Sequence, residues 1–165
     1  MLKWVKYKKK DVIILTVTST HVQTILNGSI QSLKTLIPMN INIQPPSLLT
    51  DPFIQEEIGV LVGLTGDIKG RVIIDSTTST FSAIGTKMFG MNLEGEMLES
   101  FTGEFGNMFA GNLSIKASEQ NLKIDITPPT VIVGNTKLYG FEKAFKLPTM
   151  VEDIGFLNVL FTVDE

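Results

Sequence analysis

The 165-residue chain contains no cysteine and a single histidine, His21. The absence of cysteine excludes disulfides, thiolate nucleophiles and cysteine-ligated zinc sites. A single histidine excludes any site built from two imidazoles. Chemistry in this chain must therefore use carboxylates, amides, hydroxyls or backbone groups. A cysteine-free composition fits a reducing compartment, and we expect the protein to be cytoplasmic.

The chain also lacks a strong excess of charge and a long apolar run. Its formal net charge of −3 and pI of about 5.2 give no electrostatic basis for binding nucleic acid, so we expect no such partner. The apolar run 12–15 near the N-terminus is far shorter than the roughly 18 residues of a membrane span, and we expect no membrane insertion. Five lysines precede or border this run. We expect residues 1–17 to form a basic tail or extension outside the core, with an optional strand at 12–15, and residues 18–165 to form a single domain.

Hydrophobic spacing predicts three helices and several strands in the remaining chain. The first helix is expected to begin at a cap, Ser19 or Thr20, and to end before Pro38. The second is capped within 76–80 and ends at Gly90, and the third covers about 94–118. Strands are expected at 39–43, in a hairpin of 58–64 with 70–75, at 122–126 and 131–133, and within 137–147 and 154–163.

The sequence contains an internal repeat centred on two Pro-Pro pairs. The segment 41–49, INIQPPSLL, matches 124–132, IDITPPTVI, and each follows an amphipathic helix and precedes paired apolar strands. This pattern predicts an α+β fold of two duplicated helix-plus-strands units that form an antiparallel sheet with helices packed on it.

The predicted third helix has an unusual polar face. Glu104 and Asn107 lie three residues apart on it, surrounded by Ser100, Gly103 and Gly111. Three glycines in this helix, with Gly106 as the third, cost about 1 kcal/mol each relative to alanine, which indicates close approach of another group. We interpret these small residues as letting the helix enter a partner's active site.

The chemistry that suits such a pair is narrow. A carboxylate and an amide without a neighbouring base suit phosphoryl transfer to water when the phosphoryl donor is already reactive, because positioning then supplies most of the catalysis. An Asn side chain offers both an acceptor and a donor and can hold a water in line with phosphorus. A Glu one turn earlier can pair with a lysine of the phosphoprotein.

Only the second half of the repeat carries this pair. Aligned without gaps, Glu104 and Asn107 correspond to His21 and Thr24. With three residues lost from the helix-strand connection, they correspond to Thr24 and Asn27. Neither register gives the first half a glutamate, so we expect one site and not two.

From 99 to 148 the chain resembles the CheC/CheX family of chemotaxis phosphatases, and its CheX-type members most. The resemblance is carried by EFGNMFAGNL at 104–113, DITPPTV at 125–131 and FKLP at 145–148, with Ser100 four residues before Glu104. It extends more loosely over about 19–163 and includes the predicted hairpin.

The resemblance implies a phosphatase that hydrolyses the aspartyl phosphate of a CheY-like response regulator. Asn107 would position the attacking water, Glu104 would contact the regulator, and Ser100, Gly103 and Gly111 would line the docking face. Mg²⁺ would be held by the regulator, with no metal or cofactor bound by this chain. CheX-type members tend to be homodimers, and we expect one here. The alternative is a docking or scaffolding module that binds the phosphorylated regulator without hydrolysing it.

Overall fold

The computed structural model describes residues 9–49, 53–55 and 57–164. Its helices are α1 (Lys9–Leu36), α2 (Thr78–Phe89) and α3 (Gly95–Glu119). The strands are β1 (Ile41–Ile43), β2 (Ser47–Leu49), β3 (Phe53–Gln55), β4 (Ile58–Gly66), β5 (Gly70–Ser76), β6 (Ile124–Ile126), β7 (Thr130–Val133), β8 (Thr136–Leu138), β9 (Lys143–Val151) and β10 (Gly155–Val163). No described helix is long and apolar enough to cross a membrane.

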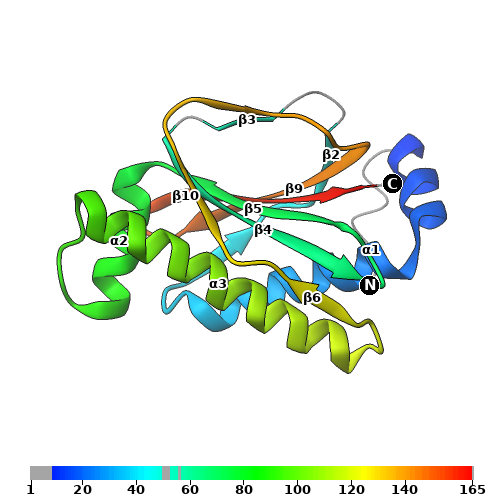
Figure 1. The fold of residues 1–165 in the computed structure, drawn as a ribbon, viewed down its shortest axis with the longest axis horizontal. Helices are drawn as coiled ribbons and strands as arrows, with labels where there is room; N and C mark the ends of the chain where they lie inside the picture. The colour runs from blue at the N-terminus through cyan, green and yellow to red at the C-terminus, as the bar shows by residue number, and fades with distance from the viewer. Residues whose placement is uncertain (1–8, 50–52, 56, 165) are drawn as a thin grey trace.

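The strands form an antiparallel sheet with the order β1-β9-β10-β5-β4-β6, in which β2 also pairs with β9 and β7 with β4. Helices α1 and α3 pack side by side against one face (Figure 1). The separate β3-β8 ribbon lies over part of the opposite face (Figure 1), where Ile73 and Leu160 are buried with Leu138 packed against them.

The sheet order confirms the predicted duplication. Each unit contributes one long hairpin, β4-β5 or β9-β10, and the two hairpins meet along β5 and β10. The short strands of each unit pair with the hairpin of the other, β1 and β2 with β9, and β6 and β7 with β4. The predicted α+β architecture is therefore formed by exchange of edge strands between two like units.

Helix α3 packs against α1, α2 and the sheet through one apolar face. Phe105, Phe109 and Leu113 are fully buried beneath it, as expected for residues spaced three to four positions apart. The ring of Phe105 makes an edge contact with Phe81 of α2 at 5.9 Å between centroids. This packing holds the N-terminal half of α3 between α2 and the sheet.

The N-terminal helix differs from the sequence prediction. Helix α1 begins at Lys9, so the start predicted at Ser19 or Thr20 is wrong, and 12–15 is helical and not a strand. The physical reason is that neither glycine nor proline occurs between Lys9 and Asn27, so a good capping residue sits inside an uninterrupted helix. Within the predicted tail, 1–8 lies outside the described residues.

Candidate functional site

Four of the five predicted site residues line one open hollow of about 610 Å³ between α3 and the connection from β6 to β7. Ser100, Gly103, Glu104 and Asn107 form the helical wall. The fifth, Gly111, lies one turn beyond Asn107 and outside this lining. The opposite wall is made by 126–129 and Val131, including the second Pro-Pro pair.

The side chains of Glu104 and Asn107 are exposed on the helix surface. Neither side chain has a hydrogen-bond or ion-pair partner within the described residues. Both amide and carboxylate are therefore available to a ligand without loss of an internal contact. No three carboxylate or imidazole side chains of the described chain converge in a way that could hold a metal ion.

Two glycines set the distance between α3 and the sheet. A Cβ at Gly103 would lie 3.1 Å from Cγ2 of Val131, and a Cβ at Gly106 would overlap the side chain of Val60. The interpretation that all three glycines open the helix to a partner is therefore wrong for Gly106, which faces the protein's own sheet. Gly111 has nothing within 4 Å of a notional Cβ. The docking role of Gly103 remains a prediction, since it also borders the hollow.

The proline wall is fixed by a residue that the sequence reasoning missed. The backbone N–H of Gly63 donates to Oγ1 of Thr127 at 2.7 Å, and the N–H of Thr127 donates to the carbonyl of Gly63 at 3.0 Å. Thr127 immediately precedes Pro128, so these two bonds tie the wall to β4. In the other unit, Gln44 and Pro148 take the places of Thr127 and Gly63. The N–H of Gln44 donates to the carbonyl of Pro148 at 2.8 Å, but Pro148 has no N–H, so the second hydrogen bond cannot form.

A contact between the two long helices decides the register of the repeat. The hydroxyl of Ser32 donates to Oδ1 of Asn112 at 3.3 Å, and these residues are 80 positions apart. The same offset superposes buried positions of α1 on buried positions of α3, namely Val22, Ile25, Leu26, Ser29 and Leu33 on Thr102, Phe105, Gly106, Phe109 and Leu113. The register with three residues lost is therefore the one that the structure supports.

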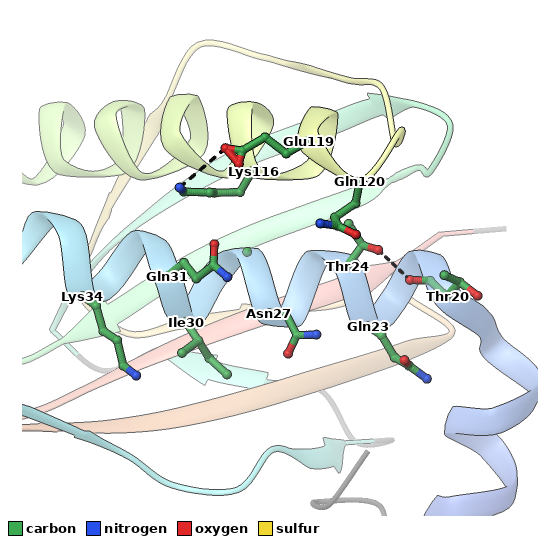
Figure 2. Close-up of a pocket in the computed structure, with 11 residues that line it drawn as sticks. Thr20, Gln23, Thr24, Asn27, Ile30, Gln31, Lys34, Lys116, Glu119 and Gln120 are labelled. Carbon is green, nitrogen blue, oxygen red and sulfur yellow. Dashed lines mark hydrogen bonds and ion pairs between the residues drawn. The ribbon is translucent and has the colours of Figure 1, made fainter. Parts of the chain in front are cut away.

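In this register the predicted site has a partial counterpart on α1. The counterparts of Ser100, Gly103, Glu104, Asn107 and Gly111 are Thr20, Gln23, Thr24, Asn27 and Gln31. Figure 2 shows these α1 residues around a hollow between α1 and the C-terminal end of α3. The asparagine is present in both halves, but threonine replaces the glutamate and glutamine replaces both glycines.

The α1 hollow contains no carboxylate from its own helix. The hydroxyl of Thr24 donates to the carbonyl of Thr20 at 2.9 Å, so it is engaged within the helix. The one carboxylate that lines the hollow, Glu119 of α3, lies 3.7 Å from the ammonium of Lys116 (Figure 2). Both helices carry the asparagine. Within their described residues, only α3 has a glutamate one turn before it on a surface bordered by small residues.

Comparison with known proteins gives consistent matches. A family model described as chemotaxis phosphatase CheX matches residues 58–147, which include both walls of the α3 hollow. A curated protein of Thermotoga maritima named CheY-P phosphatase CheX is 33% identical over 135 residues, covering 77% of this chain and 87% of that protein.

Solved structures with the same fold include CheX from Borrelia burgdorferi, determined in a complex described as CheX-CheY-BeF₃-Mg²⁺. It has a TM-score of 0.73 and 25% identity, covering 88% of this chain and 98% of that one. A CheC-like superfamily protein from Shewanella sp. PV-4 has a TM-score of 0.73 and 22% identity, covering 88% of this chain and 97% of that one.

Proposed function

Because this chain belongs to the CheX family of chemotaxis phosphatases, we propose that it hydrolyses the aspartyl phosphate of a CheY-like response regulator at the α3 hollow. The observation that carries the proposal is the pair Glu104 and Asn107 on the exposed face of α3 beside the Pro128-Pro129 wall, where neither side chain has a partner in the part of the chain that the structure describes. The Borrelia relative was crystallised with CheY, BeF₃ and Mg²⁺, and BeF₃ is a stand-in for the phosphoryl group.

In the proposed reaction, Asn107 orients one water for in-line attack. Its amide oxygen accepts a hydrogen bond from the water, and its amide N–H donates to a phosphoryl oxygen. The bond from the water oxygen to phosphorus forms as the bond from phosphorus to the aspartate oxygen breaks. The water oxygen enters the phosphate with both of its protons, so the products are the free aspartate carboxylate and dihydrogen phosphate, which then exchanges a proton with bulk water.

Glu104 is proposed to dock the regulator. One turn before Asn107 on the same face, its carboxylate can accept hydrogen bonds from a cationic side chain of the regulator. Such a bond would fix the rotation of α3 relative to the phosphoryl group and so the direction in which Asn107 points. Ser100, Gly103 and Gly111 would contact the regulator around this pair. Mg²⁺ is proposed to be held by the regulator, where it offsets phosphoryl charge.

We infer further that the protein acts as a cytoplasmic homodimer. The composition supports the cytoplasmic location, and the resemblance to CheX-type members supports the dimer. The short strands β1 and β6 end the main sheet and leave backbone groups for pairing with a second copy.

The proposed activity is tested by the decay of a phosphorylated receiver, which is the CheY-like protein that carries the aspartyl phosphate. Each CheY-like receiver of the same organism is phosphorylated with a small-molecule donor, and its dephosphorylation is followed with and without this protein. The proposal predicts faster decay for at least one receiver. Binding of a receiver without any acceleration would favour the docking or scaffolding module.

A further inference from the structure

Two exposed apolar side chains lie on α3 in line with Glu104, one near each end of the helix. We propose that Met97 and Ile115 are apolar anchors for the regulator that docks at Glu104 and Asn107, so that the docking surface extends along most of α3. This inference rests on the proposed function and adds the residues that set affinity. Met97 is 52% exposed and Ile115 is 62% exposed.

The positions of the two side chains follow from helix geometry. Met97 precedes Glu104 by seven residues and Ile115 follows it by eleven. At 100° per residue both separations return to nearly the same side of the helix. Single exposed apolar residues are ordinary on a protein surface. Their alignment with the proposed site, one on each side of it, is what indicates a shared surface.

The span matches the footprint of one partner. At a rise of about 1.5 Å per residue, Met97 and Ile115 are separated by about 27 Å along α3. A standard interface buries about 800 Å² on each partner, which corresponds to a patch roughly 30 Å across. The midpoint falls between Glu104 and Asn107. One regulator centred on the pair would therefore reach both anchors at the rim of its contact.

Between the two anchors this face carries Ser100, Gly111 and the half-buried Met108 around the polar pair. Apolar contacts around a polar centre exclude bulk solvent and strengthen the interactions inside. At this site they would separate the single oriented water from the surrounding solvent.

The α1 half offers an internal comparison. The counterpart of Ile115 in the register set by Ser32 and Asn112 is Thr35. Thr35 is exposed, and its hydroxyl donates to the carbonyl of Gln31 at 2.9 Å. Of the two anchors, Ile115 is therefore replaced by a hydroxyl on the helix that lacks the glutamate, whereas the counterpart of Met97 is Val17, another apolar residue.

The test is a double variant, Met97→Gln with Ile115→Gln, in which glutamine replaces each exposed apolar side chain and is at least as good a helix former as the residue it replaces. The matched control is Phe156→Gln. Phe156 is 54% exposed and alternates along β10 with Leu157, which belongs to the core beneath the helices, so it lies on the other face of the sheet. Thermal unfolding and sizing accompany all three proteins.

Two measurements separate this inference from the proposed function. Binding is measured with a receiver activated by BeF₃⁻ and Mg²⁺, and turnover with the phosphorylated receiver. The double variant is expected to raise both Kd and KM about 10-fold or more, with kcat within twofold of wild type and the control unchanged. Unchanged Kd and KM would overturn the inference, as would loss of a dimer without a change in Kd. Tight binding of wild type without turnover would overturn the proposed function, while the effect of the double variant on Kd would still decide the role of the anchors.

Discussion

At the scale of the residue, Glu104 and Asn107 are exposed on α3 and make no hydrogen bond or ion pair with another residue of the described chain. Thr127, by contrast, is engaged by Gly63, and Ser32 by Asn112. Substitution of an exposed side chain without internal partners typically changes the free energy of unfolding by about 0.5 kcal/mol or less. Effects of such substitutions on turnover can therefore be attributed to the reaction or to docking.

The charge of Glu104 can be tested separately from its size. Glu104→Gln is expected to raise KM for the phosphorylated receiver roughly 5- to 10-fold, equivalent to about 1 to 1.4 kcal/mol, because a charge-assisted bond to a cationic group is lost. The salt dependence of KM should decrease in parallel. The control is Glu119→Gln, an exposed glutamate near the end of the same helix. Equal effects of the two variants would contradict a docking role for Glu104.

At the scale of the element, α3 has one face fitted to the sheet and one left open, and its glycines serve different faces. Gly106 lies against Val60 and Gly103 against Val131, whereas Gly111 contacts nothing within 4 Å of a notional Cβ. Close packing of α3 onto β4 and β7 places Asn107 beside the proline wall. The distance between α3 and the sheet therefore determines the shape of the proposed site as well as the packing of the core.

Paired alanine substitutions test this division. Gly106→Ala should destabilise the protein by about 1 to 3 kcal/mol, because the added methyl group overlaps Val60 in a packed interior. Gly111→Ala should stabilise it by up to about 1 kcal/mol through helix propensity, while weakening binding of the activated receiver. Urea unfolding and receiver binding give the two readouts. Unchanged receiver affinity in Gly111→Ala would remove Gly111 from the docking face.

At the scale of the whole molecule, the duplication creates two similar halves with different surfaces. The halves share an asparagine, Asn27 or Asn107, and exchange edge strands across the sheet. They differ in the glutamate, in two glycines and in the hydrogen bond from Gly63 to Thr127, whose counterpart donor is absent at Pro148. The first half thus serves as an internal reference for the second.

Much of this arrangement could be predicted from the sequence. The hairpin strands are apolar runs joined by turn residues, α2 has clear caps at Thr77 and Gly90, and α3 carries apolar residues at helical spacing. The Pro-Pro repeat indicated two units. The start of α1 could not be predicted, because Ser19 and Thr20 suit a cap equally well inside a longer helix. The register of the halves and the orientation of Gly106 depend on contacts between distant segments, such as Ser32 with Asn112 and Gly106 with Val60, which local patterns do not contain.

The oligomeric state is a prediction at this scale. Sizing combined with light scattering should give twice the 18.1 kDa chain mass for the full chain, and twice its own smaller mass for a form that begins at residue 18. The shortened form tests whether 18–165 is a sufficient domain, because it removes the first helical residues from Lys9. A monomeric mass for the full chain would contradict the dimer, and loss of cooperative unfolding in the shortened form would contradict the domain boundary.

The role of Asn107 in orienting the attacking water is tested most directly by comparing it with Asn27, which occupies the equivalent position in the duplicated fold. Single-turnover decay of the phosphorylated receiver is measured with wild type, Asn107→Ala and Asn27→Ala at saturating protein. Asn107→Ala is predicted to slow decay by about 100-fold or more, because the attacking water is no longer oriented, while Asn27→Ala decays at the wild-type rate. Wild-type decay with Asn107→Ala, or equal losses in both variants, would contradict the account.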